Sequence, residues 1–389
     1  MRILYLHQFF ITRAGVGGTR SYEFARRFVA RGHHVRMVTA SGGRRNVEGI
    51  EVVGVRGGYS DYVSATAVSY PRRMLAFVRF ALAATAAALR GARPDVVYAT
   101  SPPLTMALPA LAAAARWRAP LVFEVRDLWP EAPIQMGALR NRALQRLGRE
   151  IERFVYRRST RLIALSPGIR DRVIAAGAHL EKVAMIPNAA DLDLFSPSLD
   201  GAAERRRLGL GDRFVCSYFG TMGEANDLSQ VIEAAPLVED VRFVLLGDGK
   251  RRPELERAAP RNVLFRGPAA TKQEVAALAA ASDACLTIFK DVPVLATNSP
   301  NKLFDTFAAG RAAIVNTPGW MRELVEENEA GVFVRPGDAR DLAAKVAWLR
   351  DNPDVVERFG RNARALAERE FDRDRLAEQA LSVLEEAAR

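Results

Sequence analysis

The stretch FEVRDLWPEAP at residues 123–133 concentrates charged side chains directly after an apolar run of strand length. Glu124, Arg126, Asp127 and Glu131 would crowd the carboxyl end of a buried parallel strand, where α/β proteins bind their ligands. Carboxylates beside an arginine can supply a general base or bind substrate hydroxyl groups. The alternative is an ion-paired loop that binds nothing. We predict that Glu124, Arg126 and Asp127 take part in catalysis.

A second candidate is the segment SPNKLFDTFAAG at residues 299–310. Ser299 followed by Pro300 is typical of a helix N-cap with proline at the first helical position. Lys302 then falls in the first turn, where the helix dipole disfavours a cation unless an anion such as a diphosphate is bound nearby. Asp305 follows on the same face and can accept sugar or ribose hydroxyls. The alternative is a capped helix with an exposed Lys–Asp pair.

A glycine-rich loop lies between an apolar run and a helical pattern near the start of the chain. Gly15, Gly17 and Gly18 allow a close backbone approach, and the N-terminus of the following helix can bind an anion. The loop is not G-x-G-x-x-G, and positions 36–46 hold no acidic residue that could bind a ribose, so a nicotinamide cofactor is not expected. It is either a phosphate or substrate loop or a tight strand-to-helix turn.

Alternating strand and helix patterns along almost the whole chain indicate how these residues are positioned. Runs such as RILYLHQFF, DVVYATS and LVFEVRD, and later RFVCSYFG and VRFVLLGDG, predict buried parallel strands with helices between them. The fold class expected is α/β, with two doubly wound domains that hold a ligand in the cleft between them. We place the first domain at 1–188 and the second at 189–371, with a final helix at 372–389 that returns to the first domain.

The charge is distributed unevenly between the two predicted domains. The 389 residues carry a formal net charge of +11. Residues 1–188 hold 29 Lys and Arg against 12 Asp and Glu, a net charge of +17, whereas the remainder holds 27 against 33, a net charge of −6. The first domain is therefore expected to meet an anionic partner. Nucleic acid is not expected, because no known nucleic-acid-binding module with interleaved basic and aromatic residues is present.

Two segments of the basic half could contact a membrane. Met74–Leu89 is apolar, with Arg72, Arg73 and Arg79 in or beside it, and is either an interfacial helix or an alanine-rich helix packed on the sheet. The segment Arg140–Arg161 is either a solvated helix face or a contact with anionic lipid. No apolar segment reaches the roughly 18–20 residues of a membrane span.

Cysteine and histidine usage gives little material for disulfides or metal sites. There are two cysteines and four histidines, no aspartate pair of the D-x-D type follows a predicted strand, and no signal peptide is evident. We expect a cytoplasmic protein, peripheral on the inner face of the cytoplasmic membrane, with no bound metal and no cofactor.

Seven segments in a fixed order resemble one enzyme family. They are GGTRSYEFARRFVARGHHV, VRDLWPE, IALSPGIRDRV, VAMIPNAADLDLF, VLLGDG, NVLFRG and SPNKLFDTFAAGRAAIV. The sequence resembles the retaining glycosyltransferases of family 4, which have the GT-B fold of two facing Rossmann-like domains. Among them it looks closest to bacterial polysaccharide and O-antigen enzymes, including N-acetylfucosamine transferases.

The resemblance implies a nucleotide-sugar donor held mainly by the second domain and an acceptor held mainly by the first. Asp305 stands where the family binds ribose, and Lys302 lies beside the diphosphate or sugar. The other positions implied to bind the donor are Gly17, Gly18, Thr221, Gly247, Asp248, Gly249, Arg266, Gly267, Asn298, Ser299 and Asn301. Arg20, Arg72, Arg73 and Arg79 are assigned to the acceptor or the membrane.

Several positions depart from the family pattern. The first glutamate of its E-x7-E motif would fall at Thr297, and Thr221 replaces an arginine that usually neutralises the diphosphate. The first-domain histidine of the V-H-D-L-W-P motif is Arg126 here. Lys302, Arg126 or Arg20 would have to supply the missing cations.

The resemblance implies transfer of a hexosyl unit, N-acetylated or deoxy sugars included, from a UDP-sugar to a polyprenyl-pyrophosphate-linked saccharide in cell-surface polysaccharide biosynthesis. The configuration at the sugar would be retained, with the leaving diphosphate helping to deprotonate the acceptor. The alternatives are a sugar-nucleotide epimerase of the same architecture and a catalytically degraded scaffold protein on the membrane.

Overall fold

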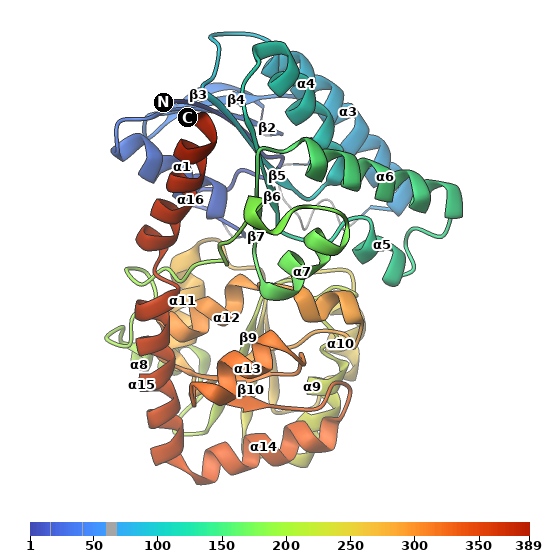
Figure 1. Cartoon of the computed structure of the whole chain (residues 1–389). Coiled ribbons are helices and arrows are strands. Elements are labelled where there is room, and N and C mark those ends of the chain that lie inside the picture. The colour runs from blue at the N-terminus through green and yellow to red at the C-terminus, as the bar shows by residue number, and fades with distance from the viewer. Residues whose placement is uncertain (16, 41, 60–67) are drawn as a thin grey trace.

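The computed structural model describes residues 1–15, 17–40, 42–59 and 68–389. This part of the chain forms two α/β domains, each built on its own sheet (Figure 1). The strands of the first sheet are β1 (Arg2–Leu6), β2 (His34–Thr39), β3 (Gly43–Val47), β4 (Ile50–Gly54), β5 (Val96–Ser101), β6 (Leu121–Val125), β7 (Arg161–Ala164) and β8 (Val183–Met185).

The first sheet has the strand order β3-β4-β2-β1-β5-β6-β7-β8. All pairings are parallel except that of β3 with β4, an antiparallel hairpin that the alternating pattern does not predict. Every residue of β5 and β6 is buried, as expected for strands covered by helices on both faces. The helices of this half are α1 (Arg20–Ala30), α3 (Tyr70–Ala88), α4 (Ala107–Trp117), α5 (Glu131–Gln135), α6 (Arg142–Arg158) and α7 (Pro167–Ala175), with the short 3₁₀ helices η1 (Leu104–Met106) and η2 (Leu180–Lys182).

The second sheet is entirely parallel, with the order β11-β10-β9-β12-β13-β14. Its strands are β9 (Val215–Phe219), β10 (Arg242–Leu246), β11 (Val263–Arg266), β12 (Ala284–Thr287), β13 (Ala312–Val315) and β14 (Gly331–Phe333). Its helices are α8 (Gly201–Leu208), α9 (Ser229–Ala234), α10 (Arg252–Ala258), α11 (Lys272–Ala281), α12 (Asn301–Ala308), α13 (Trp320–Glu327), α14 (Ala339–Asp351) and α15 (Pro353–Glu370), with η3 (Ala235–Leu237) and η4 (Pro293–Thr297).

The chain passes between the domains twice, and the two crossings are paired with each other. The amide of Ala190 donates to the carbonyl of Phe371 at 2.8 Å, and Ala190 forms a parallel bridge with Asp372. The final helix, α16 (Arg373–Ala388), then packs against α1 and against β5, β6 and β7 of the first sheet (Figure 1). The first sheet is thus covered by α1 and α16 on one side and by α3, α4 and α6 on the other.

Candidate active site

The loops after β9 and β10 interlock at the carboxyl edge of the second sheet. Gly247 has φ +147°, and a Cβ there would lie 1.9 Å from the Gly220 carbonyl oxygen, so only glycine fits. Gly249 approaches the backbone of Met222 in the same way, with φ +156° and 2.5 Å to its carbonyl oxygen. These contacts hold the exposed Asp248 between the two glycines at the sheet edge.

Three further predicted donor positions lie at the same edge, because the carboxyl ends of parallel strands meet there. Thr221 follows Gly220, and its carbonyl oxygen accepts a hydrogen bond of 2.7 Å from the Tyr218 hydroxyl. Arg266 ends β11, and its carbonyl oxygen accepts from the Gly247 amide at 3.3 Å. Gly267 follows it, exposed and with open space around its Cα.

The prediction that Ser299 caps a helix beginning at Pro300 is wrong by one residue. Helix α12 begins at Asn301, Pro300 occupies the cap position, and no side chain caps the helix. The Ser299 hydroxyl instead accepts from the Asn188 amide of the interdomain crossing at 3.1 Å, and Asn188 in turn donates to the Ser299 carbonyl. Ser299 therefore holds the crossing against the start of α12, and the half-buried Asn298 precedes it.

Lys302, in the first turn of α12, is a cation that has no carboxylate partner within the described residues. Its Nζ donates to the Tyr218 hydroxyl at 2.8 Å and lies 4.2 Å from the Tyr218 ring centroid. A Cβ at Gly220 would lie 3.1 Å from the same Nζ, so the lysine reaches the loop after β9. Burial without a counter-charge lowers the pKa of Lys302 to about 7.

Asp305 is not paired with Lys302 and does not face an open site. Its carboxylate is buried at 4% exposure and accepts from Lys272 Nζ at 3.3 Å. Lys272 also pairs with Asp191, which in turn pairs with Arg373 at the start of α16. Burial raises the pKa of Asp305 to about 6, although Lys272 opposes this rise. The structure gives this carboxylate a protein partner in place of the hydroxyl predicted from the sequence.

The glycine loop of the first domain reaches the start of α12. A Cβ at Gly18 would lie 3.1 Å from Arg126 Nη2 and 3.6 Å from Asn301 Nδ2, so the two domains meet at this point. Gly17, beside it, is exposed and has φ +141°, a conformation that favours glycine in the turn into α1. The loop, the stretch after β6 and the helix with Lys302 are thus brought together from three distant parts of the sequence.

The predictions for Arg20 and Glu124 are wrong, because both side chains lie in the core. Arg20 is 1% exposed and Glu124 is fully buried, with Arg20 Nη2 2.9 Å from Glu124 Oε2. Tyr98 and Thr100 donate to the two carboxylate oxygens at 2.6 and 2.8 Å. Burial opposes ionisation of Glu124, but the Arg20 charge outweighs it and holds the pKa below its usual range. Neither residue can contact a membrane or a substrate.

Asp127 differs from Glu124 although the two are only three residues apart. Asp127 is half-buried, and burial raises its pKa, with Arg126 opposing the rise. Arg126 makes no ion pair within the part of the chain that the structure describes, and its Nη1 lies 3.3 Å from His7 Nε2. Of the three predicted catalytic residues, Arg126 is therefore the one placed at the domain junction by its contacts.

Thr297, where the family pattern has a glutamate, packs against the first domain. Its carbonyl accepts from the Ser166 hydroxyl, and a Cβ at Gly168 would lie 2.9 Å from its Cγ2. Both of those residues belong to the start of α7. Position 297 therefore forms a contact between the two domains.

The arginines assigned to the membrane lie on α3, on the outer surface of the first domain. Arg72 and Arg79 are exposed, whereas Arg73 is half-buried and stacks 5.2 Å from the Tyr70 ring centroid. Among the described residues, no helix is both long and apolar enough to span a bilayer. Two of the three arginines are therefore open to solvent, and the third is held against a neighbouring ring of the same helix.

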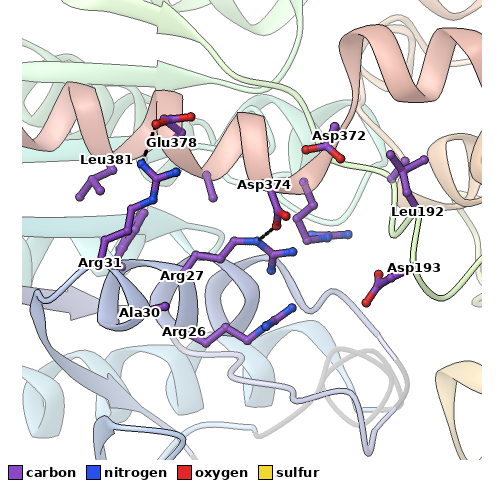
Figure 2. Close-up of a pocket in the computed structure, with 14 residues that line it drawn as sticks. Arg26, Arg27, Ala30, Arg31, Leu192, Asp193, Asp372, Asp374, Glu378 and Leu381 are labelled. Carbon is purple, nitrogen blue, oxygen red and sulfur yellow. Dashed lines mark hydrogen bonds and ion pairs between the residues drawn. The ribbon is translucent and has the colours of Figure 1, made fainter.

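A separate groove of about 480 Å³ lies between α1 and α16 (Figure 2). Its arginines are paired with acidic side chains: Arg27 with Asp374, and Arg31 with Glu378 at 2.6 Å (Figure 2). Because these charges neutralise one another within the protein, we interpret the groove as part of the packing interface between α16 and the first domain.

Sequence reasoning missed Tyr218 and His7, which contact Lys302 and Arg126. Tyr218 stands in a strand that is buried throughout, and His7 directly follows another buried strand. Nothing in the spacing links Tyr218 to Lys302, 84 residues away, or His7 to Arg126, 119 residues away. The only available signal was the position of each residue at the carboxyl end of a predicted strand.

Two family descriptions match the chain, one for each domain. Residues 16–189 match the family "Glycosyl transferase 4-like domain", and residues 213–352 match "Glycosyl transferases group 1". Each of the two domains is thus similar to a glycosyltransferase domain family, over less than half of the chain in each case.

The curated relatives are distant and are only partly spanned. D-inositol 3-phosphate glycosyltransferase of Thermomonospora curvata is 28% identical over 280 residues, which are 64% of this chain and 62% of that protein. A putative colanic acid biosynthesis glycosyl transferase, WcaI of Escherichia coli, is 27% identical over 55% of this chain and 54% of its own. The chain thus spans less than two thirds of each of these relatives.

Solved structures agree in fold along the full length. HepE of Anabaena in complex with UDP-glucose superposes with a TM-score of 0.76, covering 99% of this chain and 100% of its own at 19% identity. Sucrose-phosphate synthase of Thermosynechococcus elongatus gives 0.80, covering 99% and 98% at 16% identity. The predicted fold class, two Rossmann-like domains in the GT-B arrangement, is confirmed.

Proposed function

We propose that the protein transfers a hexosyl unit from a UDP-sugar to a lipid-linked saccharide acceptor. The observation that carries this proposal is Lys302, a cation without a carboxylate partner in the described chain, at the first turn of α12 and beside the Gly220 loop. A buried ammonium without a counter-charge is costly, and a bound diphosphate would remove that cost. The family match and the UDP-glucose complex of the structural relative HepE support the choice of donor.

The second domain would hold the nucleotide, and the junction would hold the reacting groups. Lys302 lies beside the interlocked loops after β9 and β10, and Arg126 approaches from the first domain. The acceptor hydroxyl oxygen would bond to the anomeric carbon as the bond from that carbon to the diphosphate breaks, and its proton would pass to the departing diphosphate. Positioning and charge stabilisation are then the main demands on the protein. The configuration at the sugar would be retained.

The acceptor side of the proposal rests on the outer surface of the first domain. Helix α3 exposes Leu75, Val78 and Leu82 at 50, 44 and 58%, with Arg72 and Arg79 exposed on the same helix. Apolar side chains flanked by arginines suit the interface of a membrane with anionic lipids. A lipid-linked acceptor, with a polyprenyl pyrophosphate as the carrier, would be presented there.

Helix α6 extends this surface, since both it and α3 contact α4. It exposes four apolar side chains while five of its six arginines are exposed, and only three of its residues are buried. The exposed apolar residues are Leu144, Leu147, Ile151 and Phe154, at 53, 54, 38 and 44%. The role in cell-surface polysaccharide synthesis that we propose is supported by the similarity to WcaI and by the fold shared with WaaG, a glycosyltransferase involved in lipopolysaccharide biosynthesis.

Donor binding is tested by isothermal titration of UDP and UDP-sugars against Lys302→Ala. Loss of one charge-assisted contact is expected to weaken binding about 10- to 100-fold. The matched control is Lys345→Ala in α14, another lysine of the same domain, which should bind UDP as the wild type does. Unchanged affinity in Lys302→Ala would refute the diphosphate role.

Membrane binding is tested by sedimentation with phosphatidylglycerol and phosphatidylcholine vesicles at low and high salt. The double variant Leu144→Ser/Leu147→Ser should sediment less than the wild type, and high salt should reduce the preference for the anionic vesicles. Leu237→Ser, at a 56% exposed position of the second domain, is the control. Equal binding of the wild type to both lipids would exclude the electrostatic contribution.

A further inference from the structure

His7 makes contacts through both ring nitrogens at the carboxyl end of β1. It is fully buried, with Nδ1 2.9 Å from the Ser21 hydroxyl and Nε2 3.3 Å from Arg126 Nη1. Ser21 is itself 1% exposed and belongs to the first turn of α1, which follows the glycine loop. The imidazole therefore connects that loop and helix to the stretch after β6.

The partners of His7 determine its protonation state. A guanidinium has only donors, so Nε2 must present its lone pair to Arg126. The single ring proton then lies on Nδ1 and is donated to Ser21, whose own hydroxyl faces the carbonyl oxygen of Phe9 at 3.5 Å. Burial and the charge of Arg126 both lower the pKa of His7, in agreement with a neutral ring.

Within the described residues, Arg126 has a hydrogen-bond partner only in this neutral ring, unlike Arg20, which pairs with Glu124. Its Nε is buried and has no hydrogen-bond partner in the described chain, and no carboxylate of that part pairs with it. Its Nη2 points to the place where Gly18 meets Asn301, the residue before Lys302. The guanidinium thus keeps its charge and a free face at the domain junction.

We propose that His7 is a positioning residue that holds Arg126 as the phosphate-binding cation of the first domain, opposite Lys302 of the second. A neutral acceptor directs the guanidinium without neutralising it, whereas a carboxylate in the place of His7 would cancel the charge that the ligand needs. The bound chemistry is a phosphate oxygen, supplied either by the donor nucleotide or by the pyrophosphate of a lipid carrier. This inference rests on the proposed function, because it assumes a phosphate-bearing substrate.

The test compares His7→Leu, which removes the acceptor, with His7→Gln, which keeps an acceptor oxygen near the place of Nε2. Binding of UDP and of farnesyl pyrophosphate is measured by titration calorimetry, together with the melting temperature. His7→Leu is expected to weaken one of the two ligands about tenfold, as Arg126→Ala does, and His7→Gln should restore most of the loss. The ligand that is weakened identifies the source of the phosphate.

A double-mutant cycle separates positioning from a general loss of structure. His7→Leu combined with Arg126→Ala should bind no more weakly than Arg126→Ala alone, since His7 acts through Arg126. Additive losses, or wild-type affinity for both ligands in His7→Leu, would overturn the inference. If His7→Leu does not fold, the same cycle is run with His7→Ala, which also removes the acceptor nitrogen. Failure of the wild type itself to bind UDP would instead refute the proposed function.

Discussion

Arg20, which is buried in the first domain, and Lys302, which is half-buried in the second, are two cations with opposite electrostatic surroundings. Arg20 is held by Glu124 and by the backbone carbonyls of Ile186 and Pro187, so its donors are satisfied within the first domain. Lys302 has the phenol hydroxyl of Tyr218 as its partner, and no carboxylate of the described segments pairs with it. The difference teaches that a buried cation indicates a binding site only when the protein leaves its charge unbalanced.

Removal of one partner of the Arg20–Glu124 ion pair should give the largest effect on stability. Glu124→Leu leaves the Arg20 guanidinium buried without a counter-charge, and the free energy of unfolding is expected to fall by about 3–5 kcal/mol. Chemical denaturation measures this change. The double variant Arg20→Met/Glu124→Leu should recover much of the loss, because it leaves no charge behind. A single variant as stable as the wild type would contradict the description of the pair.

Because Lys302 has no counter-charge, the affinity for the nucleotide-sugar donor should depend on pH. The pKa of Lys302 is about 7 because of burial, and a bound diphosphate would raise it, so binding takes up a proton above pH 7. The dissociation constant for a UDP-sugar is therefore expected to rise by up to about tenfold per pH unit above pH 7. In Lys302→Arg the charge persists throughout this range, so the slope should disappear. A pH-independent wild type would contradict the uncompensated charge.

Removing the unbalanced charge should not destabilise the fold. Lys302→Met replaces a desolvated ammonium by an apolar side chain of similar length, and the free energy of unfolding is expected to stay constant or rise by about 1 kcal/mol. The effect should be greatest below pH 7, where the wild-type folded state must carry the charge. A loss of more than about 1 kcal/mol would show that the contact with Tyr218 is structural.

The smallest expected effect is that of a metal chelator on the rate of sugar transfer. The cations Lys302 and Arg126 have no carboxylate partner in the described chain and are available to neutralise a diphosphate, so transfer should proceed at an unchanged rate in excess EDTA. The assay follows release of UDP with and without the chelator, and magnesium is added back as a control. A rate that falls with EDTA and recovers with magnesium would show that the two cations do not suffice.

The alternating pattern predicted most of the fold, because hydrophobic periodicity reports on elements that are buried on both faces. The hairpin partner β3 escaped it, since four of its five residues are exposed. The candidate site was predicted only in part. Glycine loops and the first turn of a helix are local features, whereas the pairing of Arg20 with Glu124 joins residues 104 positions apart. Sequence spacing therefore identified the charged residues without showing which of them neutralise one another.

Ser299 illustrates the same limit at short range. A serine before a proline is a good helix cap in isolation, but here the amide of Asn188, 111 residues away, donates a hydrogen bond to the serine hydroxyl. Ser299 therefore does not cap α12, because its hydroxyl is bonded to a residue distant in the sequence, which local capping rules do not consider. Prediction from sequence is weakest where segments from two domains compete for one polar group.

The return of α16 to the first sheet makes the second domain an insertion within the first. The first domain buries Leu376, Leu381 and Leu384 of this helix, so its core is incomplete until α16 has been synthesised. During translation the second sheet, complete at β14, is made before the helix that closes the first. A fragment that ends at the first crossing would expose the apolar face that α16 covers, so the first core can be completed only after all of the second sheet has been made.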